Sequence, residues 1–390
     1  MKLRYILPAS LILTVLKFTG ISLSKRVMRI INGATIFDYS IGDIFLTLEN
    51  ELLAGNKHIR IGDHDVDQFV LCPMMMHFSC TENNRSETHY PLKTKRFEDQ
   101  IHDLFHGIHV YKNETAHSKL QIYPFLGVTF DPEVNEPAQL KSILDSAFAD
   151  YPSLDQHGDL PNEELIQLRK EHFMGKMDQM KDTEEPYYCG VKVYPPLGFD
   201  ATPSYELEQD SADVLFDFCS KRGIPIVSHT SPGGYQTIDD EQAKDTTFPI
   251  NWHKVLEKHT HLKLNFAHFG PELRGIRIDK WKVEIVKLME EYPNVYTDLS
   301  CRLGKAKEYK HLLSTVDRLV QSQEINEQQL CERLLFGTDF PMCLFENDSY
   351  KEYIDVYGAA KLKEDLRNHL TLHNPEQFLF GKPYPKENTD

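Results

Sequence analysis

The chain has 390 residues, enough for one large α/β domain, because a barrel of alternating strands and helices takes about 250 residues. Hydrophobic residues make up 41% of the chain and charged residues 26%, as in folded globular proteins, which excludes disorder as the dominant state. The 43 Lys and Arg against 59 Asp and Glu give a formal net charge of −16. This charge repels polyphosphate backbones and anionic membranes, so we expect no nucleic-acid partner.

The cysteines and the N-terminal segment indicate in which cellular compartment the protein is expected. The seven cysteines are scattered and form no C-x-x-C pair, which predicts structural thiols in a reducing compartment. Residues 5–23 are mostly apolar, but Pro8 and Lys17 interrupt them, so the clean run is shorter than the ~20 residues that a spanning helix needs. We therefore favour a buried or amphipathic helix here and a cytoplasmic protein. A secretory signal or a membrane tether formed by residues 5–23 is the alternative.

From about residue 60 onward, short apolar runs alternate with segments of helix length. Strands that are apolar almost throughout are typical of a parallel sheet covered by helices on both faces. Seven such runs lie at residues 66–75, 121–130, 189–194, 224–229, 262–268, 295–299 and 334–339. The alternation predicts an α/β protein, a (β/α)8 TIM-type barrel whose first strand is degenerate or missing.

The pattern also predicts the organisation of the chain. We expect an N-terminal helical segment of uncertain role at residues 1–60 and a barrel domain at residues 61–390. Residues 29–37 are the only plausible donor of the first strand, and their pattern is weak. Residues 230–252 follow a strand end directly and are too long for a tight connection, so they are the best candidate for a lid over the active-site face.

Three ionisable residues stand at the ends of predicted strands: His229, His268 and Asp339. The carboxyl ends of barrel strands converge on one face, where catalytic groups from distant sequence positions meet. Two imidazoles and a carboxylate suit a divalent metal such as zinc and the water that it activates. For any one of them alone, a hydrogen-bonded histidine or a capping aspartate is the commoner interpretation. Their joint placement favours a functional site.

Six segments in order carry a resemblance to a known family. They are GVKVYPPLGF (190–199), IPIVSHTSPGG (224–234), LKLNFAHFGPE (262–272), VYTDLS (295–300), LLFGTDFP (334–341) and HNPEQFLFG (373–381). Together they resemble the amidohydrolase superfamily, in the amidohydrolase-related branch that contains aminocarboxymuconate-semialdehyde decarboxylase. The resemblance extends from about residue 66 to residue 381.

The resemblance implies roles for the three strand-end residues. It makes His229 a metal ligand, and His268 a second-metal ligand or a catalytic acid/base beside the metal. It makes Asp339 a metal ligand that also takes the proton from the attacking water. The implied cofactor is a divalent metal, zinc in the first place and manganese as the alternative.

The chain departs from the family in one respect. The histidine-x-histidine pair that ends the family's first strand, and supplies two metal ligands, occurs nowhere in the sequence. Its nearest imitation, around His64, precedes the second-strand run and is better explained as a polar turn on the opposite rim. A catalytic zinc needs three protein ligands, so His268 would have to join His229 and Asp339, which predicts weak occupancy or none. His77, beyond the second strand, is a weaker candidate ligand or substrate contact.

Two explanations of the missing pair stay open. The chain begins downstream of the first strand, or the protein has diverged into a metal-free barrel that binds a ligand or a partner. An open barrel exposes strand edges that invite association, so a homo-oligomer is an expected outcome of the first explanation.

Other polar residues have structural interpretations. Lys192 alternates with two valines on a predicted strand, which turns it into the barrel. We favour an ion pair with Asp298 or Asp339 over a metal-bridging role, because pairing is the commoner way to keep a lysine buried. His102, His106 and His109 have helical spacing and are expected on a solvated face.

The sequence therefore predicts a metal-dependent hydrolase that acts on a small organic substrate through metal-activated water. Its expected catalytic residues are Asp339 and His268, and its expected metal ligands are His229, His268 and Asp339. A decarboxylase of the same branch, or a non-catalytic metal-free barrel acting as a binding or scaffold protein, is the alternative.

Overall fold

The structure is a computed structural model that describes residues 27, 29, 33, 35–77, 96–130, 136–180, 185–270, 280–301, 303–322 and 325–385. Residues 5–23, for which we expected a buried or amphipathic helix, a signal or a tether, lie outside this part of the chain. None of the described helices combines the length and the apolar character needed to cross a membrane.

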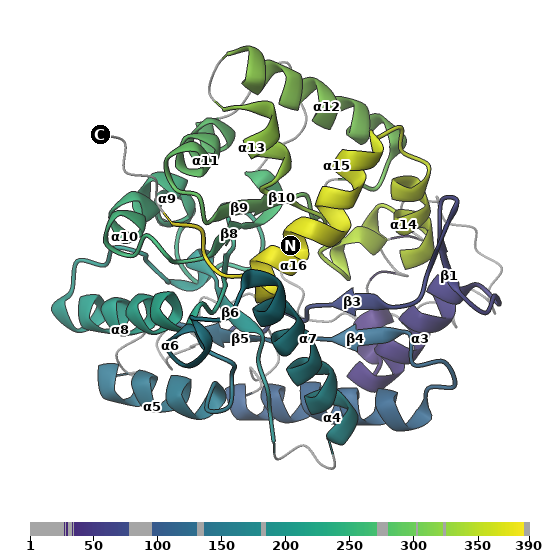
Figure 1. Ribbon diagram of the computed structural model, residues 1–390, viewed down its shortest axis with the longest axis horizontal. Coiled ribbons are helices and arrows are strands. Elements are labelled where there is room, and N and C mark those ends of the chain that lie inside the picture. The colour runs from purple at the N-terminus through teal and green to yellow at the C-terminus, as the bar shows by residue number, and fades with distance from the viewer. Residues whose placement is uncertain are drawn as a thin grey trace.

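Parallel strands form the centre of the molecule (Figure 1). Six of them pair in the order β10-β9-β8-β7-β6-β5. Their bounds are β5 (Phe125–Val128), β6 (Gly190–Val193), β7 (Ile226–Ser228), β8 (Leu264–Phe266), β9 (Val295–Asp298) and β10 (Leu334–Leu335). A second parallel pair, β3 (Phe69–Leu71) with β4 (Leu120–Ile122), is tied to β5 by the parallel bridge between Met74 and Phe125. Each of the seven predicted apolar runs contains one of these strands, and β4 and β5 both overlap the single run at residues 121–130. The predicted TIM-type α/β fold is confirmed.

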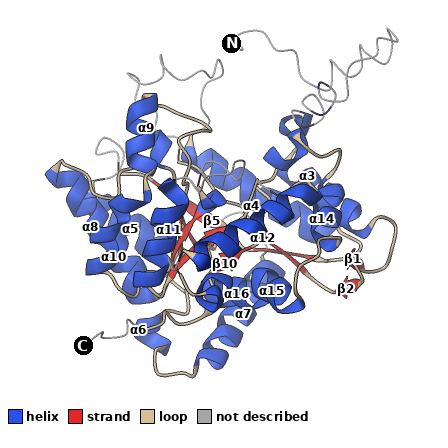
Figure 2. Ribbon diagram, turned by 90° about the horizontal axis from the view of Figure 1, so that it is seen from above, coloured by secondary structure: helices blue, strands red, loops and turns tan. Residues whose placement is uncertain are grey.

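Helices surround the strands (Figure 2). The longer ones are α3 (Ile41–Leu53), α4 (Phe97–Glu114), α5 (Pro137–Ala147), α7 (Asn162–Gln179), α8 (Glu206–Arg222), α9 (Asp240–Thr247), α11 (Lys280–Glu291), α12 (Ala306–Gln321) and α14 (Tyr350–Gly358). The shorter ones are α6 (Leu154–His157), α10 (His253–Lys258), α13 (Glu327–Cys331), α15 (Glu364–Asn368) and α16 (Asn374–Phe380). Single helical turns are η1 (Ile36–Asp38), η3 (Pro195–Leu197), η4 (Pro249–Trp252), η5 (Ala267–Phe269), η6 (Met342–Phe345) and η7 (His369–His373).

The proposed donor of the first barrel strand is not a strand. The described residues among 27–35 are helical, and η1 follows them. A Cβ on Gly33 would lie 3.2 Å from the Phe345 ring of η6. This segment is therefore held by packing against η6, and not by pairing with a strand. Within the described residues, β3 pairs only with β4 and β10 only with β9. The first strand is therefore missing there, and the expectation that residues 29–37 supply it was wrong.

The N-terminal helix α3 is fastened to the barrel by a buried carboxylate. Glu49 is 1% exposed and accepts hydrogen bonds from the Tyr111 hydroxyl of α4 and the Lys119 amide, both at 2.6 Å. The hairpin of β1 (Ile59–Ile61) and β2 (His64–Val66) follows α3. The predicted division between residues 60 and 61 stays a prediction, and β1 spans it.

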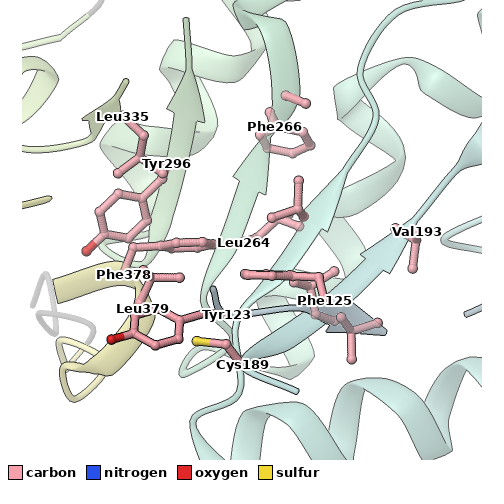
Figure 3. Packing of buried hydrophobic residues seen from close by; sticks show 14 of the residues in the cluster. Tyr123, Phe125, Cys189, Val193, Leu264, Phe266, Tyr296, Leu335, Phe378 and Leu379 are labelled. Carbon is pink, nitrogen blue, oxygen red and sulfur yellow. The ribbon is translucent and has the colours of Figure 1, made fainter. Parts of the chain in front are cut away.

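The C-terminal helix α16 closes the end of the barrel where the strands begin. Figure 3 shows Phe378 and Leu379 directed at strand residues, among them Tyr296 and Leu264. The rings of Phe378 and Tyr296 lie 5.1 Å apart. The catalytic face of such a fold lies at the opposite end of the strands. The role of this apolar layer is therefore to stabilise the fold.

A buried arginine secures the same end. Arg169 of α7 is fully buried. Its guanidinium donates to the carbonyl oxygens of Pro152 at 2.8 Å, Phe380 at 3.0 Å and Arg222 at 3.1 Å. These carbonyls belong to three separate segments, and the planar guanidinium suits such a fork of acceptors. Arg169 thus links α7, the end of α8 and the C-terminal segment.

Arg169→Met should lower the free energy of unfolding by about 3 kcal/mol or more, because it leaves several buried carbonyl oxygens without a donor. Urea denaturation measures the loss. Arg60→Met, at an exposed position of β1, is the matched control and should stay within about 0.5 kcal/mol of the wild type. Equal losses in the two variants would contradict the assigned role.

Candidate functional site

The candidate site lies where β7, β8 and β9 end. His229 directly follows β7, His268 lies in η5 just after β8, and Asp298 is the last residue of β9. The structure brings the two predicted histidines into direct contact, with Nε2 of His268 3.1 Å from Nδ1 of His229. Their rings are nearly perpendicular, at 76°. Both side chains are 7% exposed, so water competes little for these nitrogens.

Asp298 anchors the network beneath His268. One of its oxygens, Oδ1, accepts hydrogen bonds from the Ser300 hydroxyl, from the Ser300 amide at 3.0 Å and from the His268 amide at 3.1 Å. The other oxygen accepts from the Asn265 side-chain amide at 2.7 Å. All four partners are donors, so they fit an ionised carboxylate.

The Asp298 pKa reflects this environment. Burial alone would raise it, but the positive charge of His268 and the hydrogen bonds from Ser300, His268 and Asn265 outweigh that effect, and the net pKa is lowered. Burial and the positive charges of His268 and Lys192 hold the pKa of His229 well below its usual range. Asp298 is therefore the anion of the network and His229 a neutral imidazole.

The partners at the two ends of the network fix where its protons lie. The Gly233 carbonyl, 2.9 Å from Nε2 of His229, can only accept, so this nitrogen carries a proton and Nδ1 of the neutral ring has a lone pair. At the other end, Ser300 gives its single proton to Asp298, so Nδ1 of His268, 2.9 Å from the Ser300 oxygen, must donate. In the protonated state of the pair, His268 also carries a proton on Nε2 and donates it to His229, and Asp298 balances the single positive charge. When this proton leaves, His268 is a neutral ring protonated on Nδ1.

The loop after His229 closes over this pair. Gly234 has φ of +111°, and a Cβ there would lie 2.3 Å from the Tyr194 hydroxyl, so only glycine fits this turn. The Tyr194 ring stacks on His229 with centroids 4.3 Å apart. Farther along, the Thr237 amide donates to the Pro196 carbonyl of η3 at 3.0 Å. The first part of the predicted lid thus covers His229; opening and closing of residues 230–252 stays a prediction.

Lys192 and Asp339 complete the charged groups around the site. Lys192, on β6, is 6% exposed, with its ammonium 5.8 Å from the centre of the Tyr194 ring. Burial lowers its pKa to about 8, and the charges of Asp298 and Asp339 act in the opposite direction. The charge of Asp339 also raises the pKa values of Tyr194 and Tyr235, after burial as the larger cause. Asp339 therefore shares the electrostatic environment of Lys192, whereas the ion pair favoured for Lys192 stays a prediction.

The described residues do not fit the metal that the resemblance implies. Among them, no three His, Cys, Asp or Glu side chains are grouped so that they could hold one ion. The ring nitrogens of His229 and His268 instead face each other, Gly233 and Ser300. The expected grouping of His229, His268 and Asp339 around a single ion is thus not formed in this part of the chain. The histidine-x-histidine pair that supplies two further ligands in the family is also absent from the sequence, so the family's ligand set is incomplete here.

The remaining histidine expectations concern the periphery. The His77 ring contacts the ring of Phe97, at the start of α4, with centroids 4.2 Å apart and the planes tilted by 38°. A metal or substrate contact for His77 stays a prediction. His102 and His106 are exposed on α4, as expected for a solvated helix face, and their rings stack at 6.0 Å. His109 departs from this expectation, because it is half-buried and its Nε2 lies 3.0 Å from the Asn113 side-chain amide. His64 is exposed in β2, after the turn of the β1–β2 hairpin.

Comparison with known proteins identifies the family. A family model described as amidohydrolase matches residues 163–381, more than half of the chain. The chain therefore belongs to the amidohydrolase family, and the resemblance found in the sequence is confirmed. None of the curated proteins matches it.

Two crystal structures match this chain over most of its length. One is a putative 2-pyrone-4,6-dicarboxylic acid hydrolase from Pseudomonas putida, with 15% identity and a TM-score of 0.40, over 80% of this chain and 96% of that one. The other is a probable 2-pyrone-4,6-dicarboxylic acid hydrolase from Acinetobacter baumannii with citric acid bound. Its identity is 12% and its TM-score 0.36, over 79% of this chain and 98% of that one.

Sequence reasoning missed several site residues. Ser300 and Gly233 escaped notice because each acts through a neighbouring histidine and has no motif of its own. Asn265 gave a usable signal, since an amide inside the apolar run LKLNFAH needs a buried partner. Tyr235 lies in a loop whose course the sequence does not specify.

Lys192→Met should change how stability depends on pH. The pKa of Lys192 is about 8 in the folded chain, against 10.5 for a free lysine. Between these two pH values the unfolded wild type binds more protons than the folded one, so the free energy of unfolding of the wild type increases as pH rises. The stability of Lys192→Met relative to the wild type should therefore be highest below pH 8 and decline toward pH 10.5. Guanidinium denaturation at a series of pH values measures the difference.

Lys141→Met is the control for this series, because Lys141 is an exposed lysine paired within α5. Its stability relative to the wild type should stay flat over the same range. A flat or rising difference for Lys192→Met would show that Lys192 is not held in a charge-disfavouring environment.

Proposed function

We propose that this amidohydrolase family member is a hydrolase that cleaves a small organic substrate at the ends of β7, β8 and β9. The observation that carries the proposal is the buried contact between His229 and His268, with Asp298 as its counter-charge. Hydrolysis requires a group that takes a proton from water and returns it to the leaving group. A histidine pair that can hold one additional proton is suited to both steps.

In this proposal His268 is the acid/base residue and His229 shares its proton. Asp298 stabilises the protonated pair, as a carboxylate does behind a catalytic imidazole. Lys192 is a buried cation beside the pair, and a cation in a site of low dielectric stabilises the negative charge that develops on a substrate oxygen. Asp339 would orient the substrate or serve as a second base at the rim.

The finer expectations from the sequence remain proposals. Metal-activated water is not used in this scheme, because the described residues do not complete the ligand set. Decarboxylation, a small-molecule substrate, a homo-oligomeric state and a cytoplasmic location stay predictions of the sequence.

A second candidate function is a non-catalytic barrel that binds a small molecule. Two observations favour it: the histidine-x-histidine pair is missing from the sequence, and the described residues contain no group of three metal ligands. The polar network would then fix the shape of a binding site. Turnover separates the two candidates.

His268→Gln should lower kcat/KM by about 10²- to 10⁴-fold, the usual contribution of a general acid/base residue. Hydrolysis of a panel of small lactones, esters and amides by the wild type first identifies a working substrate. His102→Gln, on the exposed face of α4, is the matched control and should keep full activity. Equal rates in wild type and His268→Gln would remove His268 from the mechanism, and no turnover across the panel would favour the binding barrel.

Metal analysis tests whether the family's cofactor is used here. We expect purified protein to contain zinc and manganese well below one equivalent, because two histidines occupied with each other make a poor site. Elemental analysis by mass spectrometry measures the content. Stoichiometric metal that is lost in both His229→Ala and Asp339→Ala would contradict this and restore the metal-dependent mechanism.

A further inference from the structure

The turn after β9 folds back onto the residue that carries the proposed chemistry. Asp298 ends β9, and Ser300 follows two residues later with its amide bonded to the Asp298 carboxylate at 3.0 Å. The same carboxylate oxygen reaches across to β8 and accepts from the His268 amide at 3.1 Å. Two residues at the end of β9 thus hold a residue that follows β8.

Asp298 holds the main chain of His268 in an unusual conformation. His268 has φ of +71°, and the next residue, Phe269, has φ of +49°. The left-handed region is rarely adopted by residues other than glycine, and such a conformation persists only where surrounding contacts impose it. The bond from the His268 amide to Asp298 is such a contact. It aims the imidazole toward His229.

Ser300 holds the ring of the same residue. Its hydroxyl has one proton, which it gives to Asp298, and its oxygen then accepts from Nδ1 of His268 at 2.9 Å. The ring therefore keeps a proton on Nδ1, and Nε2 becomes the nitrogen that exchanges a proton. Asp298, Ser300 and His268 are each less than 8% exposed, so water does not compete for the hydrogen bonds that fix these proton positions.

We propose that Asp298 and Ser300 are positioning residues that fix the tautomer and orientation of His268. Ser300 sets which ring nitrogen exchanges a proton, and Asp298 sets the orientation of Ser300 and of the His268 backbone. The inference rests on the proposed function for its catalytic meaning. Its structural content, the protonated Nδ1, can be tested without a substrate.

The test is nuclear magnetic resonance of protein with ¹⁵N-labelled histidine, in which long-range ¹H–¹⁵N correlations show which ring nitrogen carries the proton. His268 is assigned by its absence in His268→Gln. The spectra are recorded above the pH at which His268 loses its Nε2 proton, because only a neutral ring has a tautomer. In the wild type, its Nδ1 should there have the shift of a protonated nitrogen. In Ser300→Ala, which deletes the acceptor, the signal should move toward the Nε2-protonated tautomer or to an average of the two forms. An unchanged signal in folded Ser300→Ala would overturn the proposal.

Two further variants keep the test interpretable. Ser211→Ala removes a serine that is 1% exposed on α8, away from His268, and should leave the His268 signal unchanged. Asp298→Asn keeps an oxygen that can accept from Ser300 and the two amides but removes the charge. Nδ1 of His268 should therefore stay protonated in Asp298→Asn, in contrast to Ser300→Ala. Loss of the Nδ1 proton in Asp298→Asn but not in Ser300→Ala would contradict the roles assigned to the two residues.

Activity supplies the second readout once a substrate is known. Ser300→Ala should lower kcat by about 10- to 100-fold, as is common when a partner of a catalytic ligand or base is removed, and should leave KM nearly unchanged. A structural defect alone would lower the active fraction and leave the pH profile unaltered, whereas a lost tautomer preference shifts the profile. A tautomer change without any turnover in the wild type would leave the positioning role intact and defeat the proposed function.

Discussion

The site depends on one constraint: a carboxylate, a hydroxyl and two imidazoles are buried together and must satisfy one another. Inside a protein an unpaired polar group is costly, and a complete network is correspondingly rigid. The members come from the ends of β7, β8 and β9, so the parallel register of these three strands sets the distances between them. A shift of one strand by a residue would break the links that its own residues make in the network. The barrel is therefore the scaffold that makes the histidine contact, and the network in turn specifies the ends of its strands.

The two ends of the barrel have different roles, one in stability and the other in the candidate site. At the end where the strands begin, Arg169 and the apolar side chains of α16 join distant segments, with carbonyl oxygens as the acceptors of the buried guanidinium. At the other end, buried charges face one another and strained backbone is retained at His268. Stability and chemistry are thus separated along the strands, as is typical of this fold.

The sequence predicted the strands because each is an apolar run long enough to be recognised locally. It also predicted that His229 and His268 lie together, since strand ends in a parallel barrel share one face. The first strand could not be predicted in the same way: the segment around Gly33 is helical through its packing against Phe345 of η6, which lies more than 300 residues away in the chain. Ser300 and Gly233 were beyond reach because their roles depend on the course of two loops. The metal trio was inferred from strand ends alone, and side-chain contacts then directed the histidine nitrogens elsewhere.

The contact between His229 and His268 is related to the missing histidine-x-histidine pair. Histidines left at a buried rim without the other ligands would keep unsatisfied nitrogens, and such groups are costly. Here Gly233 and Ser300 satisfy the outer nitrogens, and the inner two satisfy each other through a shared proton. What these residues can provide by themselves is proton transfer and the positive charge of Lys192. Such a set suits substrates whose leaving group needs little assistance, such as activated esters, better than stable amides, which demand stronger polarisation of the carbonyl group.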